Sequence, residues 1–162
     1  MFKIIGIDPG LASTGWGVVN CNAGKIHYVS HGIIETKAAM PLAERLLLIM
    51  NSLNKIIDLH KPSVSAVEKL YFGSNVSSAI PVAQATGVIF AALAAKKIIV
   101  HELRPNVIKK GVTGFSRSEK NQVQEMVRII LGLPEIPKPD HAADALGAAI
   151  CAANISDIGD NK

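Results

Sequence analysis

The order of hydrophobic patterns predicts an α/β protein, a five-stranded mixed sheet whose first three strands are antiparallel, with helices on both faces. Residues 1–36 contain three strand-like runs joined by short turns. From Pro41 onward, helical and strand periods alternate, which indicates parallel strands joined by crossover helices. Of the 162 residues 49% are hydrophobic, which is enough for a full-sized core in one domain.

The three N-terminal strands are defined by apolar content and turn residues. Residues 2–8, FKIIGID, form an apolar run that ends in Pro-Gly, as is typical of a buried strand. Residues 14–20 and 25–36 are also strand-like, and CNAG between them favours a turn. We therefore expect these two strands to form a hairpin.

The central part of the chain alternates between helix and strand. Apolar residues recur three and four positions apart after Pro41, so an amphipathic helix is predicted to end before Pro62. Strand 63–69 follows, and its alternation places Glu68 on the same face as Val64 and Ala66. Residues 75–97 form a second helix, which is apolar on nearly every side and must be covered on both. Residues 98–100 are a short buried strand.

Three helices complete the chain. Residues 105–112 are a short helix, and the next helix is predicted to have Ser118 as its N-cap and to close near Gly132. The last helix is expected from about Asp140 to Ala153. We expect residues 1–162 to form a single nuclease domain, with an ordered core of about 2–153 and a short C-terminal tail.

Bulk properties exclude several classes of protein. No apolar run approaches the roughly 18 residues of a membrane helix, and the N-terminus lacks the features of an export signal. Cys21 and Cys151 fit no metal-binding spacing and are predicted to be buried, reduced thiols. We therefore expect a cytoplasmic protein that contacts no membrane.

Positive charge is concentrated in one stretch. Residues 104–128 carry six basic and two acidic side chains, a surplus equal to the net charge of +4 of the whole chain. Such a stretch predicts a surface for a polyanion, and a solvated basic face is the alternative. Its basic residues are Arg104, Lys109, Lys110, Arg117, Lys120 and Arg128.

Ionisable residues interrupt three apolar elements. Asp8 ends the first strand, and Glu68 lies near the end of the fourth, which right-handed crossovers can place beside the first. His141 and Asp144 share one face of the last helix because they are three residues apart. Converging carboxylates repel each other unless a divalent cation binds them, and oxygen ligands with one imidazole suit Mg²⁺ or Mn²⁺. We therefore predict a metal site in which two ions activate water and hydrolyse a phosphodiester.

Each of these residues also has a structural explanation. Asp8 could accept hydrogen bonds from turn amides, and Glu68 could be a solvated residue at a sheet edge. Asp140 could be an N-cap or a ligand. His141 could be structural, although the helix dipole favours its neutral form. Taken together these explanations are weaker, because each ionisable residue would need a separate, unrelated reason to lie on an apolar face.

Four segments carry a resemblance to a known family. GIDPGLASTGWGVV, AVEKLYFGSN, QATGV and DHAADALGAAI resemble, in order and spacing, the RuvC-type Holliday-junction resolvases. The resemblance spans residues 2 to about 153 and implies a ribonuclease-H-like fold. It also implies a homodimer that cuts four-way DNA junctions with Mg²⁺, which Mn²⁺ can replace. We expect two ions per site and nicks with 5′-phosphate and 3′-hydroxyl ends. The implied partner is a branch-migration complex of a junction-binding protein and a hexameric motor ATPase.

Catalytic residues follow from the matching motifs. Asp8, Glu68 and Asp144 match acids of the family. His141 matches a catalytic position that is Asp in some members, which leaves open whether it binds metal or transfers a proton. The role of Asp140 stays open as well.

DNA-binding residues follow in the same way. Tyr71, with its neighbour Phe72, matches an aromatic residue that stacks on a base near the junction centre. Lys109 and Lys120 match basic residues that grip DNA, and the basic stretch adds Lys110 and Arg117.

Three rival functions share parts of this pattern. GIDPGLASTG also resembles the first phosphate-binding loop of actin-like ATPases and sugar kinases, but the chain has no room for their second lobe. The second rival is a related ribonuclease-H-like nuclease that cuts RNA. The third is a junction-binding module that keeps the basic stretch but does not cleave.

Overall fold

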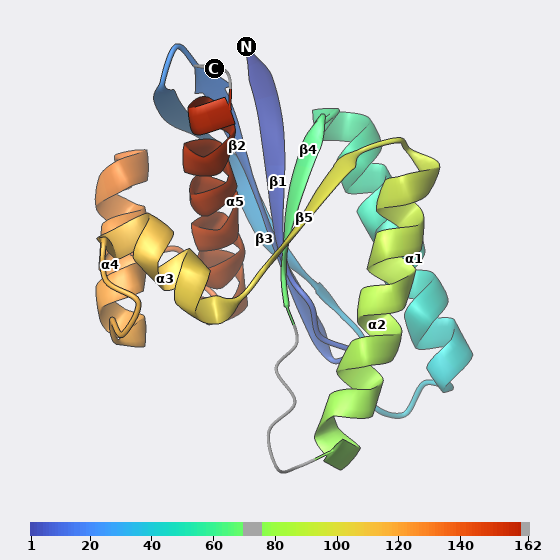
Figure 1. The fold of residues 1–162 in the computed structure, drawn as a ribbon. Helices are drawn as coiled ribbons and strands as arrows, with labels where there is room; N and C mark the ends of the chain where they lie inside the picture. Colours follow the sequence, from blue (N-terminus) through green and yellow to red (C-terminus); the bar gives the residue numbers. More distant parts are fainter. Residues whose placement is uncertain (70–75, 160–162) are drawn as a thin grey trace.

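A computed structural model describes residues 1–69 and 76–159. It contains a five-stranded sheet in the order β3-β2-β1-β4-β5 (Figure 1). The first three strands in the chain pair antiparallel, and the last two add parallel to the central one. This order confirms the predicted mixed sheet. The strands are β1 (Phe2–Asp8), β2 (Ser13–Asn22), β3 (Lys25–Glu35), β4 (Val64–Glu68) and β5 (Ile99–Leu103).

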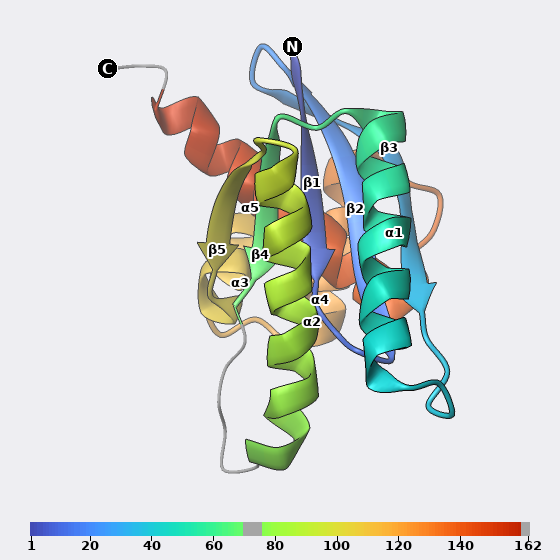
Figure 2. The same ribbon diagram turned by 90° about the vertical axis from the view of Figure 1, so that its right-hand side faces the viewer.

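Helices cover both faces of this sheet. Two of the described helices pack on one face and three on the other (Figures 1 and 2). Apolar side chains form a core on each side of the sheet. The first face carries α1 (Leu42–His60) and α2 (Val76–Ala95). The second carries α3 (Pro105–Thr113), α4 (Lys120–Leu131) and α5 (Asp140–Gly159). None of these described helices has the length and apolar character needed to cross a bilayer.

The start of α4 and the end of α5 differ from the prediction. The N-cap of α4 is Glu119, not Ser118, because Glu119 and Gln122 cap each other's backbone amides. Ser118 is instead buried, and its hydroxyl lies 2.6 Å from the Thr113 hydroxyl, closing the loop between α3 and α4. Helix α5 continues past Ala153 to Gly159.

Strand alternation aims the acidic residues at one helix. In β1, Ile5 and Ile7 join the core under α1 and α2, whereas Ile4 joins the core under α5. In β4, Val64 and Ala66 face α5 in the same way. Because side chains two residues apart share a face, the residues that end these strands also face α5, as the alternation predicted for β4.

Glycines let α5 approach the sheet closely. A Cβ atom at Gly6 would lie 1.8 Å from the Ala145 carbonyl oxygen, and one at Gly15 would lie 2.0 Å from the His141 carbonyl oxygen. Any larger residue would therefore collide with the helix backbone. The pairing of Gly15 with Asp8 across β1 and β2 brings the first turn of α5 over the end of β1.

Candidate active site

Asp8 and His141 meet where β1 ends and α5 begins. His141 Nδ1 lies 2.7 Å from Asp8 Oδ2, although the two residues are 133 positions apart in the sequence. The Asp8 side chain is 17% exposed, whereas that of His141 is 51% exposed. The contact therefore orients an accessible imidazole by means of a largely buried carboxylate.

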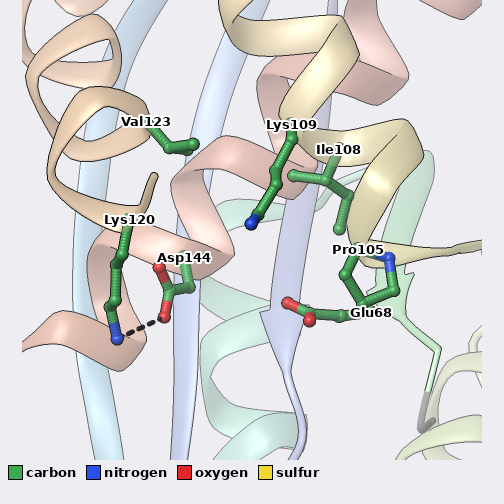
Figure 3. A pocket seen from close by; sticks show the side chains of 7 residues that line it. All are labelled: Glu68, Pro105, Ile108, Lys109, Lys120, Val123 and Asp144. Carbon is green, nitrogen blue, oxygen red and sulfur yellow. Dashed lines mark ion pairs between the residues drawn. The ribbon is translucent and has the colours of Figure 1, made fainter. Parts of the chain in front are cut away.

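Glu68 and Asp144 line a neighbouring pocket of about 210 Å³. Figure 3 shows both carboxylates and the Lys109 ammonium directed into it. Parallel strands β1 and β4 are paired up to Ile7 and Val67, so Asp8 and Glu68 follow at adjacent positions. Asp144 comes from α5, one helical turn after His141. The structure thus brings together all four predicted catalytic residues.

The carboxylates of this site are electrostatically coupled. Burial raises the pKa of Asp8, and the Asp144 charge adds to this effect, although the hydrogen bond with His141 opposes it. Burial, followed by repulsion from Asp8 and Asp144, raises the pKa of Glu68 to about 7. In the absence of a cation, the site therefore tends to retain a proton near neutral pH.

The donor atoms suit a divalent cation. Asp8, His141 and Asp144 each offer a ligand atom, and these atoms all lie within 4.8 Å of one another. Two carboxylates with one imidazole are ligands that Mg²⁺ or Mn²⁺ accepts. The Glu68 carboxylate lies outside this group of three but shares the pocket with Asp144.

Lys120 contacts two carboxylates in the first turns of α5, those of Asp140 and Asp144. Its Nζ lies 3.1 Å from Asp144 Oδ2 and 3.2 Å from Asp140 Oδ2. Burial lowers the pKa of Lys120, but the contacts with Asp144 and Asp140 outweigh it and raise the pKa overall. In turn, Lys120 lowers the pKa of Asp140. Asp140 is the first residue of α5 rather than its N-cap, and its carboxylate holds Lys120.

The predicted DNA-binding residues are spread over several places. Lys109 and Lys120 line the acidic pocket. Lys110 is exposed on α3, and Arg117 is exposed in the loop between α3 and α4, so the structure does not bring these two into the pocket. Tyr71 and Phe72 lie outside the described residues.

Sequence reasoning missed two features of this site. It gave Gly15 no role, although this glycine admits the first turn of α5. The pattern of glycines at alternate positions in TGWGVV was an available signal, because strand glycines often mark a close backbone approach. The pairing of Lys120 with Asp140 and Asp144 left no comparable signal, since these residues come from separate elements.

The raised pKa of Glu68 predicts a pH-dependent stability. Between the ordinary pKa of 4.5 and the folded-state pKa of about 7, the folded protein binds more protons than the unfolded chain. The contribution of Glu68 to the free energy of unfolding therefore falls as pH rises through this range. We expect Glu68→Gln to raise the melting temperature by several degrees at pH 8 and by less at pH 5. Thermal unfolding in the presence of a chelator measures this.

Glu135→Gln is the matched control, because Glu135 is exposed on the connector before α5. Its effect on the melting temperature should be equal at the two pH values. An equal effect of Glu68→Gln at both pH values would contradict the raised pKa.

Comparisons with known proteins are consistent with this site. The family model "Crossover junction endodeoxyribonuclease RuvC" matches residues 4–152. A relative of that description from Treponema denticola is 46% identical over 157 residues, which cover 97% of this chain and 88% of the relative. One from Chloroflexus aurantiacus is 49% identical over 151 residues, covering 93% and 92%. The solved structure "T. thermophilus RuvC in complex with Holliday junction substrate" matches with a TM-score of 0.93 at 31% identity, covering 98% and 97%.

Proposed function

The chain belongs to the RuvC family of crossover junction endodeoxyribonucleases, and we propose that it resolves four-way DNA junctions by paired, Mg²⁺-dependent hydrolysis. It is a nuclease of DNA recombination and repair with a ribonuclease-H-like fold. One observation carries the proposal: Asp8, His141 and Asp144 converge within 4.8 Å beside a pocket that Lys109 and Lys120 also line.

The residues present fit a divalent cation. We assign Asp8, Asp144 and His141 as residues that would hold it, with Glu68 contributing from the same pocket, and we propose two Mg²⁺ ions per site, replaceable by Mn²⁺. A bound ion would supply activation of the attacking water and stabilisation of the leaving oxygen. The proposed products carry 5′-phosphate and 3′-hydroxyl ends.

The protein groups have separate roles around the scissile phosphate. Glu68, whose pKa is about 7 in the absence of a cation, would lose its proton and contribute to the metal site once a cation binds beside it. His141 is oriented by Asp8 and serves either as a ligand or as a proton-transfer group. The ammonium groups of Lys109 and Lys120 attract the phosphate backbone.

We propose a homodimer, formed through α2. From Ala79 to Ala95 this helix has no charged side chain, and Ile80, Ala83, Gly87 and Ala91 form an exposed face along it. A second copy of the chain would cover this face with two-fold symmetry. Two sites related in this way match the two cuts that a four-way junction requires. In solution, the protein should have about twice the 17.2 kDa mass of the chain.

Further contacts complete the proposal. The T. thermophilus RuvC neighbour is in complex with a Holliday junction substrate, and we propose the same class of DNA for this chain. Tyr71 and Phe72 would stack on bases near the junction centre, and Lys110 and Arg117 would contact the DNA arms. A branch-migration complex would deliver the junction to this protein. We place this step in the cytoplasm and propose that residues 1–162 form a single nuclease domain.

Cleavage of a synthetic four-way junction tests the function. With Mg²⁺ or Mn²⁺ we expect paired nicks in strands of like polarity, no cutting of a linear duplex of the same sequence, and no cutting in chelator. An RNA hairpin serves as the third substrate. Preferred cutting of the RNA would contradict the proposal, and so would tight junction binding without nicks at any Mg²⁺ or Mn²⁺ concentration.

A further inference from the structure

Lys120 forms an ion pair with Asp144, a carboxylate that the proposed metal site needs as a ligand. Its ammonium contacts the same Asp144 side chain that offers a ligand atom alongside Asp8 and His141. Asp140, at the start of the same helix, holds the ammonium from a second side. The Lys120 side chain is 53% exposed, so it has solvent on one side into which it can move.

A lysine and a metal ion compete for the Asp144 carboxylate. The Lys120 ammonium lies 3.1 Å from Asp144 Oδ2, and a divalent cation held by Asp144 would draw on the negative charge of the same carboxylate. Two positive charges beside one carboxylate repel strongly in a partly buried site. Binding of a cation at Asp144 is therefore opposed by the Lys120 ammonium for as long as it stays in contact with this carboxylate.

Lys109 provides a comparison within the same pocket. It lines the pocket beside Asp144 and Glu68, but among the described residues its ammonium forms no ion pair with either acid. Both lysines add positive charge to the pocket, but the direct contact with Asp144 belongs to Lys120. Comparing substitutions of the two lysines therefore distinguishes direct competition for Asp144 from a general effect of positive charge in the pocket.

We propose that Lys120 blocks metal binding at Asp144 until a DNA phosphate draws its ammonium away, so that DNA and the divalent cation bind cooperatively. This inference rests on the proposed function in that it requires a divalent-cation site at these residues. A phosphate near Lys120 offers the ammonium a new partner, and Asp144 is then released for the cation. By linkage, DNA must raise the affinity for metal by the same factor by which metal raises the affinity for DNA.

This coupling would keep the metal site weakly occupied while no DNA is bound. A site that holds its metal weakly without DNA has little hydrolytic capacity until a phosphate occupies it. Lys120 would then act first as a substitute for the cation and afterwards as a contact to the substrate. The resemblance assigned it the second of these roles alone.

Direct measurement of Mn²⁺ binding by isothermal titration calorimetry tests the proposal without relying on cleavage. Without DNA, Lys120→Gln should bind Mn²⁺ roughly tenfold more tightly than the parent protein, within the usual range of coupling between sites. Lys109→Gln, the matched control, should change the affinity by less than about threefold. Lys120→Arg retains the positive charge and should bind Mn²⁺ no more tightly than the parent.

DNA provides the second arm of the experiment. A saturating linear duplex, with its own Mn²⁺ binding subtracted, should raise the Mn²⁺ affinity of the parent protein roughly tenfold and that of Lys120→Gln by much less. Circular dichroism establishes that each variant is folded. Equal effects of Lys120→Gln and Lys109→Gln on the Mn²⁺ affinity would contradict the proposed competition and leave the nuclease function intact. The same holds if DNA does not change the Mn²⁺ affinity of the parent protein. Failure of every variant to bind Mn²⁺ would overturn both, whereas the expected coupling without junction cleavage would overturn the proposed function alone.

Discussion

Asp8→Asn should lower the rate of junction cleavage by at least about a thousandfold while the junction still binds. Asp8 offers one of the three converging ligand atoms, and a neutral amide is a much poorer partner for a divalent cation. Loss of several kcal/mol of charge stabilisation corresponds to this factor in rate. Binding should be equal or tighter, because the substitution removes a negative charge that repels the phosphate backbone. Single-turnover cleavage and fluorescence anisotropy in chelator measure the two quantities.

Stability distinguishes this effect from misfolding. Burial raises the pKa of Asp8, so its ionised form is less favourable in the folded protein than in the unfolded chain. The contribution of Asp8 to the free energy of unfolding is therefore lost as pH rises above its ordinary value of 3.8. Asp8→Asn should consequently melt at or above the temperature of the parent protein at neutral pH.

An exposed acid on α1 provides the control. Asp58 pairs with Lys96 and its side chain is 62% exposed, so Asp58→Asn should cleave within about twofold of the parent rate, as is usual for a surface substitution. Cleavage by Asp8→Asn at the parent rate in Mg²⁺ would show that Asp8 is not a catalytic residue.

The sequence predicted this site well where the periodicity of a single strand or helix determines which way a side chain points. The alternation of β4 places Glu68 on the face of Val64 and Ala66, and the three-residue spacing of His141 and Asp144 places both at the start of α5. Placing the strand of Glu68 beside that of Asp8 needed a further rule, the handedness of the crossovers.

Other features depend on tertiary contacts that no local pattern encodes. Ser118 and Glu119 are adjacent and both have side chains able to cap a helix. The choice between them follows from Thr113, which pairs with the Ser118 hydroxyl. The partners of Lys120 likewise depend on how α4 packs beside the first turn of α5. Local patterns thus predicted the elements and the acids, but not the contacts between separate elements.

Gly15→Ala should abolish most of the activity although Gly15 has no side chain to contribute to chemistry. The new Cβ would lie 2.0 Å from the carbonyl oxygen and 2.4 Å from the carbonyl carbon of His141. Neither backbone atom is able to rotate away, so the first turn of α5 has to move off the sheet. His141 then separates from Asp8, because Gly15 pairs with Asp8 directly across β1 and β2.

The size of this effect follows from the displacement. A shift of about 1 Å at a catalytic group lowers the rate by about a hundredfold, and overpacking of this kind lowers the free energy of unfolding by about 1–3 kcal/mol. Single-turnover cleavage, thermal unfolding and the NMR signals of the His141 ring report on rate, stability and displacement respectively. The ring signals should shift between the parent and Gly15→Ala while the remaining spectrum stays that of a folded protein.

Gly147→Ala is the matched control within α5 itself. A Cβ at Gly147 would meet its nearest neighbours at 3.6–3.7 Å, which is ordinary van der Waals contact. Replacing a helical glycine by alanine should therefore raise the free energy of unfolding by about 0.5–1 kcal/mol and leave cleavage unchanged. If Gly15→Ala cleaves and melts like the parent, then the sheet tolerates a Cβ beneath His141. In that case the close approach of α5 to β2 does not position the active site.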